Sequence, residues 1–386
     1  MNKTTKTVCE LIRLSVCASQ NDKLPEQLTL EEAKNIYSLA KSHDLVHLLS
    51  TPIEQYNLSP SAEASEKFRM QKFSAIYRSK NISYELERIS ATLEEARVKF
   101  IPLKGAIIRH LYPESWMRTS CDIDILVSED DIDRAETIIA SKLSYTRKWK
   151  NNHEVSLFSA GGVHLELHYH LVGDSKREAI NSVLNKIPTE SQVKEGRDFE
   201  QVLSDAMFYF YHIAHMALHF ENGGCGMRPF LDLWLLNHRV ENPSDRRREL
   251  LEKGGLLKFA DAVTALSEVW FGKEEHTPLT EMLERYIISG GTYGNTTNSI
   301  KLKQTKNGGK FSYIISRIWL PYDRLRFRYP SLDGKRILTP FYQLRRWCGL
   351  LLGGKAAKAK AELRYAQNIT IDEQKNMSNL LSELGL

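Results

Sequence analysis

The most informative segment of the sequence is Asp122-Ile123-Asp124-Ile125-Leu126-Val127. Its alternation of acidic and apolar residues predicts a β-strand, because successive side chains of a strand point to opposite faces of the sheet. The two carboxylates therefore share one face, and the isoleucines point into the core. Two neighbouring carboxylates repel each other unless a cation lies between them. Mg²⁺ or Mn²⁺ takes oxygen ligands of this kind, so the pattern predicts a divalent cation site.

A second alternating segment, Val163 to Tyr169, follows the apolar–polar segment Glu154 to Phe158 across an Ala-Gly-Gly stretch that is typical of a hairpin. Its polar face carries Glu166 and His168. If both predicted strands pack their apolar faces on the same helices, Glu166 emerges beside the Asp pair. Three carboxylates on adjacent strands suit a two-metal phosphoryl-type transfer. His168 could bind phosphate, orient the acid, serve as a base or simply be a partly buried polar residue.

The stretch before the Asp strand contains Lys104-Gly105 at the end of a short apolar run that begins at Phe100. A glycine at a strand-to-helix turn lets a phosphate approach the N–H groups at the helix start, and Lys104 adds a positive charge. Arg118 fits either a clamp on triphosphate oxygens or an ion pair that holds the loop. Each signal is weak by itself. The specificity lies in the order of strand, glycine turn, helix, Asp strand, helix and acid-bearing hairpin.

The periodicities along the rest of the chain predict an α+β fold in which a small mixed sheet, residues 98–173, is flanked by helical regions. These are an N-terminal region, 1–97, and a region, 174–288, that closes the site and contains a helix from Phe199 to Phe220. Residues 289–310 are rich in Gly, Thr and Asn and predict a mobile loop. Residues 311–386 predict a basic helical region, and ten Lys or Arg against two Asp between 321 and 360 suit an anionic partner or a solvated face.

The composition is that of an ordinary globular protein, with 42% hydrophobic and 26% charged residues and a net charge of +5 over 386 residues. No apolar run approaches the roughly 18–20 residues of a membrane span, and the N-terminus lacks the features of a signal peptide. The five cysteines are scattered without metal-ligand spacing, which indicates reduced thiols and a cytoplasmic location. The modest charge and the absence of an aromatic-rich basic repeat disfavour nucleic acid as a partner.

Several short motifs follow one another along the chain: Pro102-Leu103-Lys104-Gly105, Tyr112-Pro113, Arg118, the Asp strand and Glu166-Leu167-His168. With these motifs the stretch from Phe100 to Val172 resembles the minimal nucleotidyltransferases of the DNA polymerase β-like fold, and is similar to a bacterial group described as nucleotidyltransferase family proteins. The likeness continues through His212, His215 and Arg228 to Asp232, and reaches Tyr329-Pro330.

The resemblance implies that Asp122 and Asp124 are metal ligands and that Glu166 is the third acid. It implies Mg²⁺-dependent transfer of a nucleoside monophosphate from a nucleoside triphosphate, with ATP as the first choice, to a hydroxyl of a small molecule, sugar, peptide or protein. Two departures stand out. The family usually has Gly-Ser where this chain has Gly105-Ala106, and the third acid is commonly Asp.

Three further alternatives remain open at the level of sequence. His212, His215 and His219 share one face of a predicted helix, which suits packing, part of a nucleotide pocket or, without an intervening acid, a weak zinc site. Arg228 and Asp232 are one helical turn apart and suit either the nucleotide site or a pair with each other. The whole chain could instead be a non-catalytic nucleotide- or partner-binding module, or a nucleotide-sugar glycosyltransferase that uses the Asp pair.

Overall fold

The computed structural model describes residues 1–17, 26–171, 178–241, 243–292, 294–306, 308–352 and 356–386. These residues form two compact units. The first comprises Met1–Ala217 and Met227–Glu284, and the second comprises Leu218–Gly226 and Arg285–Leu384. The expected end of the α+β core near residue 173 falls within 172–177, outside the described residues. No helix within the described ranges is long and apolar enough to cross a membrane.

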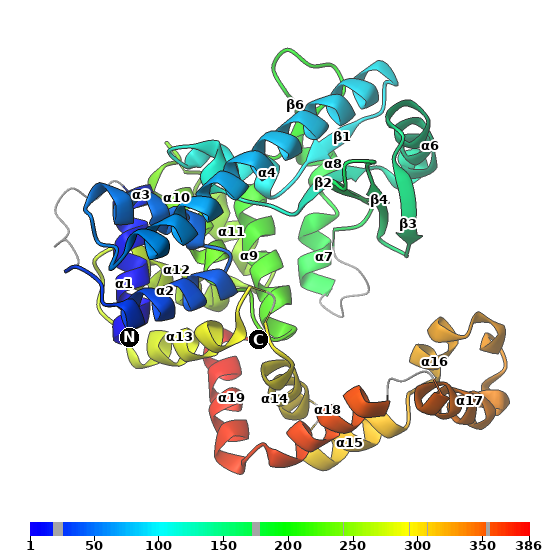
Figure 1. Ribbon diagram of the computed structural model, residues 1–386. Helices are drawn as coiled ribbons and strands as arrows, with labels where there is room; N and C mark the ends of the chain where they lie inside the picture. Colours follow the sequence, from blue (N-terminus) through cyan, green and yellow to red (C-terminus); the bar gives the residue numbers. More distant parts are fainter. Residues whose placement is uncertain (18–25, 172–177, 242, 293, 307, 353–355) are drawn as a thin grey trace. The chain divides into compact units, whose positions relative to one another are not determined.

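The first unit is built around a five-stranded mixed sheet with the order β1-β2-β5-β4-β3, which confirms the predicted α+β class (Figure 1). Its strands are β1 (Phe100–Pro102), β2 (Asp122–Val127), β3 (Thr146–Lys150), β4 (Glu154–Phe158) and β5 (His164–His168). β2 and β5 are parallel, and the other neighbouring pairs are antiparallel. β3 was not predicted from the sequence, because all five of its side chains are exposed and give no apolar alternation.

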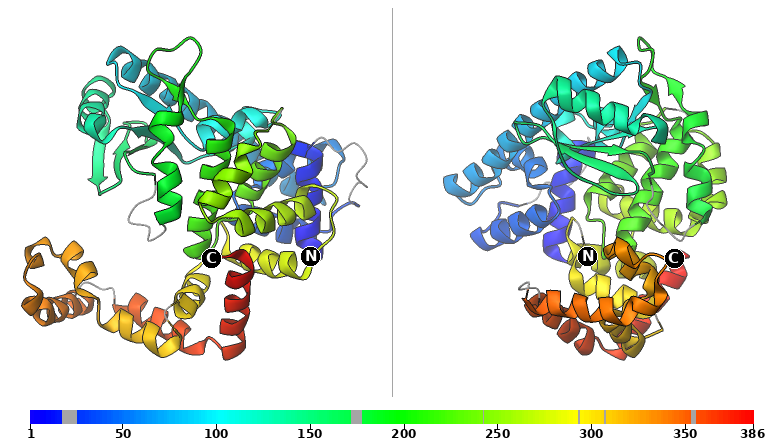
Figure 2. Two further views of the ribbon diagram at one scale, coloured as in Figure 1. Left: turned by 180° about the vertical axis from the view of Figure 1, so that it is seen from behind. Right: turned by 90° about the vertical axis from the view of Figure 1, so that its right-hand side faces the viewer.

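One face of the sheet is apolar and is covered by two helices, α4 (Ala62–Glu95) and α6 (Ile132–Leu143) (Figures 1 and 2). Ile123 and Ile125 of β2 and Leu165 and Leu167 of β5 are buried in this layer, at 2% exposure or less. The isoleucines therefore point into the core as the alternation predicts. The opposite face is left to the acidic and histidine side chains of the same strands.

The remaining helices of the first unit are mostly those that the sequence predicts. The N-terminal helices are α1 (Lys3–Ile12), α2 (Leu30–Ser42) and α3 (Val46–Gln55), and short helical turns α5 (Gly105–Ile108), α7 (Glu178–Leu184) and α8 (Ile187–Glu190) lie around the sheet. The helices α9 (Asp205–Glu221), α10 (Arg228–His238), α11 (Arg246–Lys253), α12 (Leu257–Phe271) and α13 (Pro278–Gly290) follow. The last residues of α9, from Leu218, and of α13, from Arg285, belong to the second unit. The ring of Phe230 on α10 packs edge-on against Trp270 on α12, with centroids 4.9 Å apart, in the helical core.

The predicted single helix from Phe199 to Phe220 is wrong over its first residues. The chain there forms a two-stranded sheet, β6 (Gln192–Val193) with β7 (Gln201–Val202), and α9 begins only at Asp205. The backbone N–H of Phe100 donates to the carbonyl of Phe199 at 3.2 Å. The segment before α9 therefore covers the outer edge of β1, a role that helical periodicity does not reveal.

The second unit contains α14 (Thr296–Lys306), α15 (Lys310–Ile318), α16 (Tyr322–Arg328), α17 (Thr339–Leu352), α18 (Ala356–Asn368) and α19 (Ile371–Leu384). The mobile loop predicted for 289–310 is wrong where α14 runs. Asn295 accepts a hydrogen bond from the N–H of Asn298 at 2.7 Å, and the buried side chain of Asn298 donates to the carbonyl of Tyr286 at 3.1 Å. The polar residues that suggested a loop are therefore a helix cap and a buried hydrogen bond.

Candidate active site

The parallel register of β2 and β5 brings the predicted acids together. Asp122 lies opposite His164, and Asp124 lies opposite Glu166. Because both strands run in the same direction with their apolar faces on the same helices, all four side chains project from the open face. Among the described residues, two groups have potential ligand atoms within 4.8 Å of one another: Asp122 with His164 and Glu166, and Asp124 with Glu166 and His168.

Asp124 is the most buried acid of this cluster, with 3% exposure. One of its oxygens, Oδ1, accepts from Lys104 Nζ at 2.7 Å and lies 2.8 Å from His168 Nε2. Burial is the largest effect and raises the pKa of Asp124, but the charge of Lys104 and the hydrogen bond from His168 together outweigh it. The pKa of Asp124 is therefore held well below its usual range, and the carboxylate is ionised.

Asp122 has the opposite electrostatic environment, although it lies two residues away on the same face. Burial, followed by repulsion from Asp124, raises the pKa of the Asp122 carboxyl. The cluster therefore contains more negative charge than its own cations neutralise. Its donors are oxygen-rich, with three carboxylates and two imidazoles on adjacent strands. This donor set fits a hard divalent cation such as Mg²⁺, for which Asp122, Asp124 and Glu166 would be the ligands.

His168 is held between acids on both sides. Its Nε2 lies 2.8 Å from Asp124 and 3.5 Å from Glu166, and its Nδ1 lies 3.2 Å from Glu154 of β4. Burial lowers the pKa of His168, but hydrogen bonds to Asp124 and Glu166 outweigh it and raise the pKa to about 9. Of the expected roles, orientation of an acid is the one that these contacts support, and the acid that His168 contacts most closely is Asp124 rather than the expected Glu166. Glu154 was not predicted, since it lies one strand away from the motif.

The turn between β1 and α5 has a strained backbone at Lys104. Its φ of 46° and ψ of −116° are values that residues with a Cβ rarely adopt. This conformation lets the side chain reach Asp124 from the turn. The following residue, Gly105, faces Ser120, whose side chain would lie 3.4 Å from an added Cβ. The glycine thus leaves room between the turn and the loop that precedes β2.

Arg109 is a buried cation at this turn that the sequence reasoning missed. It is 5% exposed, its Nε donates to the carbonyl of Gly105 at 2.8 Å, and its Nη1 donates to Ser83 Oγ at 3.1 Å. No carboxylate among the described residues forms an ion pair with it. Burial, and then the nearby charge of Arg118, lower its pKa. A buried guanidinium without a carboxylate provides a positive charge for an anionic ligand.

Arg118 has the alternative role that the sequence allowed, an ion pair that holds the loop. Its Nε donates to both oxygens of Asp232, at 2.8 and 2.9 Å, and Tyr112 donates to the same carboxylate at 2.7 Å. Of the two alternatives for Arg228 and Asp232, the pair with each other is wrong, because Arg228 instead contacts Asp44 at 2.8 Å. These side chains fix α10 and the loop before β2 to each other.

The helix α9 contributes a residue that was not predicted. Tyr211 is buried, and burial is the main reason why the pKa of its hydroxyl lies above the ordinary value. The charge of Lys104 lowers this pKa, and the charges of the three acids raise it. His212, on the next position, lies 2.9 Å from the carbonyl of Pro229 through Nε2. That contact supports a packing role for His212, and neither group of potential metal ligands in the described ranges contains it or His215.

The mixed sheet, the glycine turn and the acids of β2 and β5 together define a nucleotidyltransferase type of core. The chain belongs to the family described as uncharacterised nucleotidyltransferase, whose model matches residues 30–272. The protein is accordingly a transferase of phosphorus-containing groups. No curated protein and no solved structure matches the chain.

The match covers the sheet, the helices packed on it and α10 with Arg228 and Asp232. It favours nucleotidyl transfer over the glycosyl transfer that the Asp pair alone allowed.

Proposed function

We propose that the protein transfers a nucleoside monophosphate from a nucleoside triphosphate to an acceptor hydroxyl, with Asp122, Asp124 and Glu166 as ligands of Mg²⁺ or Mn²⁺. The observation that carries the proposal is the surplus of carboxylate on the open face, next to the partly exposed Lys104 and the buried Arg109. A divalent cation held by these three carboxylates would supply the positive charge that neutralises the phosphate oxygens during transfer.

The residues of the chain have separate tasks in this proposal. Lys104 and Arg109, at the strained turn, bind the phosphates of the donor. His168 keeps Asp124 ionised and fixes the position of its carboxylate. Arg118 and Asp232 position the loop before β2. The acceptor oxygen forms a bond to the α-phosphorus, the bond from that phosphorus to the bridging oxygen of the β-phosphate breaks, and pyrophosphate leaves. The hydroxyl proton passes to a carboxylate of the cluster.

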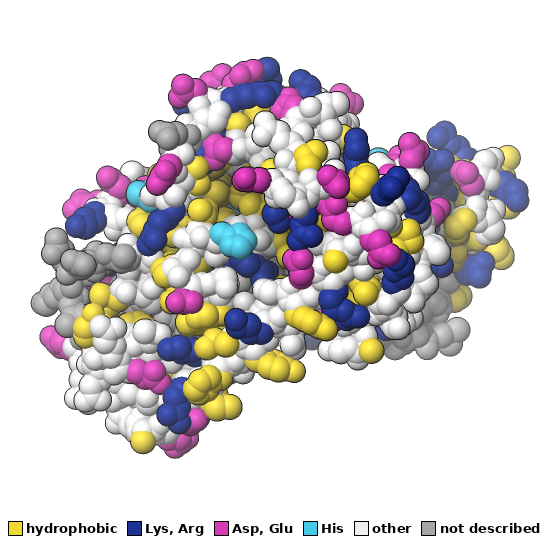
Figure 3. Space-filling model, turned by 90° about the horizontal axis from the view of Figure 1, so that it is seen from above, with side chains coloured by type: hydrophobic (Ala, Val, Ile, Leu, Met, Phe, Trp, Pro, Cys, Tyr) yellow, Lys and Arg dark blue, Asp and Glu magenta, His cyan; other side chains and the backbone are white. Residues whose placement is uncertain are grey.

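A small acceptor is proposed in place of a nucleic acid. The chain has a net charge of only +5, and on the face seen in Figure 3 the acidic and basic side chains are interspersed, without a continuous basic stripe. A phosphate backbone requires such a stripe.

The ion pair between Lys104 and Asp124 favours a second candidate, a non-catalytic nucleotide-binding module. The Lys104 ammonium contacts the oxygen that a metal would use, at 2.7 Å. In that case a nucleoside triphosphate would bind equally well with and without Mg²⁺. The transferase and the module therefore differ in the metal dependence of binding.

Calorimetric titration of ATP, GTP, CTP and UTP, each with Mg²⁺ and with EDTA, tests the proposal on the wild type and on Asp124→Asn. We expect one nucleotide to bind with Mg²⁺, and the Asn variant to bind it at least about 100-fold more weakly, because a charged ligand of the metal is lost. Asp130→Asn, on the exposed turn after β2, is the matched control and should bind as the wild type does. Absence of nucleotide binding under all conditions would rule out the transferase proposal.

A further inference from the structure

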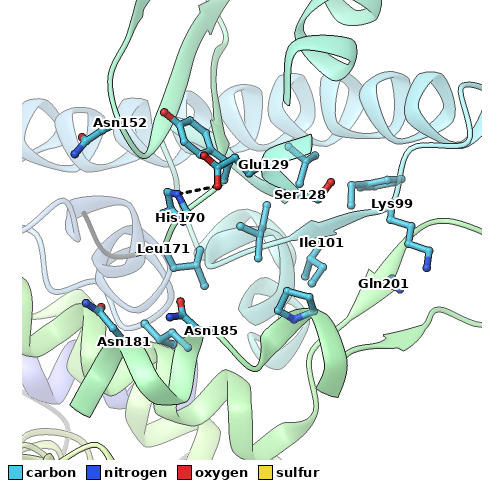
Figure 4. A pocket seen from close by; sticks show the side chains of 16 residues that line it. Lys99, Ile101, Ser128, Glu129, Asn152, His170, Leu171, Asn181, Asn185 and Gln201 are labelled. Atoms are coloured by element: carbon cyan, nitrogen blue, oxygen red, sulfur yellow. Dashed lines mark ion pairs between the residues drawn. The ribbon is translucent and has the colours of Figure 1, made fainter. Parts of the chain in front are cut away.

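The open face of the sheet continues beyond the carboxylates into a cavity of about 800 Å³ (Figure 4). Leu126 of β2 lines it and lies two residues beyond Asp124 on the same face, which places the two Cα atoms about 7 Å apart. His170, which follows β5, lines it in the same relation to His168. A ligand in this cavity would therefore lie along the same two strands as the carboxylate cluster.

The base of the cavity is apolar and its surroundings are rich in carboxamides. Ile101, Leu126 and Leu184 are buried apolar residues of the lining, and Asn181, Asn185 and Gln201 add amide groups. Figure 4 shows Asn181 and Asn185 on the helix side, with Leu171 next to them, and Gln201 on the opposite side, with Ile101 between the two sides. Asn181 lies on α7 and Asn185 directly follows that helix, and the N–H of Asn185 still donates to the carbonyl of Asn181 at 2.9 Å, so the two residues keep a helical spacing. Gln201 is held by a hydrogen bond from Ser191 at 2.9 Å.

The charge of the lining is close to neutral. Its ionisable side chains include Lys99, Glu129 and His170, and the last two lie 3.6 Å apart as a pair. A phosphorylated or polyanionic ligand would call for several cations, and a polycationic one for several acids. Carboxamides both donate and accept hydrogen bonds, as hydroxyl groups do. This chemistry matches a neutral molecule with many hydroxyl groups.

A peptide is the competing neutral ligand, and the strand edge argues against it. Peptides are commonly bound by addition of a strand to an exposed sheet edge. Here the outer edge of β1 is already occupied, because the N–H of Phe100 donates to the carbonyl of Phe199, and Phe100 bridges to Glu200. Recognition in the cavity therefore depends on side chains, which suits a compact ligand.

We propose that this cavity binds the acceptor, and that the acceptor is a neutral carbohydrate or glycosyl group whose hydroxyl is directed toward the carboxylate cluster. This inference rests on the proposed transferase function for the role of the bound molecule as acceptor. The carbohydrate binding itself rests on the lining of the cavity alone.

Saturation-transfer NMR on the full chain tests the binding, with glucose, galactose, mannose, N-acetylglucosamine and a blocked glycine-rich tetrapeptide as probes. We expect at least one sugar to receive saturation. Asn185→Leu should weaken its binding about fivefold, the effect of one lost hydrogen bond, and Leu171→Trp should weaken it by filling the cavity. Asn35→Leu, the same change at an exposed position of α2, should leave it unchanged. All three variants should bind Mg²⁺ and nucleotide as the wild type does.

The outcomes separate this proposal from the function on which it rests. If only the peptide binds, or if no sugar binds while nucleotide binding persists, the carbohydrate proposal is wrong and the transferase stands. Sugar binding that neither cavity variant weakens would place the site elsewhere. If a sugar binds but no nucleotide does, the acceptor role fails together with the transferase. For a sugar that binds, we expect it to stimulate release of pyrophosphate from the nucleotide in the wild type but not in Asp124→Asn, and no stimulation would overturn the acceptor role.

Discussion

Two groups of buried charges in the first unit have opposite character. Around Asp232, Arg118 donates to both carboxylate oxygens and Tyr112 donates to one of them, so the negative charge is paired and hydrogen-bonded within the protein. Around Asp124, the acids outnumber the cations, and the pKa of neighbouring Asp122 is raised by burial and by Asp124. The first group has its partners already, and the second has capacity for a ligand.

The comparison distinguishes charged residues that stabilise this fold from those that are available to bind a ligand. Burial alone does not distinguish them, since Asp124 and Asp232 are both below 4% exposure. What distinguishes them is whether the surrounding charges balance. A substitution in the balanced group should therefore act on stability, and one in the unbalanced group should act on ligand binding.

The largest effect is expected from Asp232→Asn, which leaves Arg118 buried without a countercharge. We expect the free energy of unfolding to fall by about 3–5 kcal/mol, measured by urea denaturation. In the double variant Arg118→Met with Asp232→Leu, neither charge is left alone, and much of the loss should be recovered. A loss below about 1 kcal/mol for Asp232→Asn would show that the balanced group contributes little to stability.

A second test concerns His47, whose Nε2 lies 2.8 Å from the carbonyl of Met117, next to Arg118. Burial lowers the pKa of His47 to about 4, so the folded protein keeps this ring neutral. In the unfolded chain the ring takes up a proton below about pH 6.5. The contribution of the neutral His47 to the free energy of unfolding is therefore fully present above that pH. As the pH falls toward 4, the free energy of unfolding decreases by up to roughly 3 kcal/mol.

The measurement is a series of urea midpoints between pH 7 and pH 4 for the wild type and for His47→Gln. We expect the urea midpoint of the variant to depend less on pH, by the part that His47 causes. The amide of the Gln side chain should still donate to the carbonyl of Met117. Equal slopes in both proteins would contradict a neutral buried His47.

The third test addresses the unbalanced group through Arg109, the buried cation for which the described residues supply no carboxylate. Arg109→Met should weaken binding of the nucleoside triphosphate by about 10- to 100-fold, because a guanidinium is lost from the phosphates. Titration calorimetry measures the effect. Arg69→Met, on the exposed part of α4, is the matched control and should bind normally. If Arg109→Met binds the nucleoside triphosphate with unchanged affinity, Arg109 has only a structural role.

The smallest effect is expected at Lys104, where two contributions oppose each other. Lys104→Met removes the cation from Asp124, so Mn²⁺ without nucleotide should bind about tenfold more tightly, because competition for the carboxylate is lost. Paramagnetic resonance of free Mn²⁺ measures this affinity. The same variant should bind the nucleotide more weakly. If Mn²⁺ affinity stays the same, Lys104 does not compete with a metal for Asp124.

Much of the fold and part of the candidate site could be predicted from the sequence. The alternation in β2 correctly placed Asp122 and Asp124 on one face with the isoleucines in the core, and the same rule placed Glu166 and His168 on the open face of β5. The Lys104-Gly105 turn was also found. These inferences depend on the two-residue period of a strand, which the backbone imposes wherever a strand forms.

The tertiary structure decided which charges meet. Arg118 pairs with Asp232, which lies 114 residues away in the sequence. The spacing of one helical turn between Arg228 and Asp232 had instead suggested that these two residues pair with each other. Three other features also depend on elements far apart in the chain: Arg109 has no ion pair with a carboxylate in the part of the chain that the structure describes, Glu154 lies beside His168, and a cavity lies beyond Leu126. Local periodicity fixes the direction of a side chain relative to its own strand or helix, whereas its partners depend on how those elements pack, which no short stretch of sequence contains.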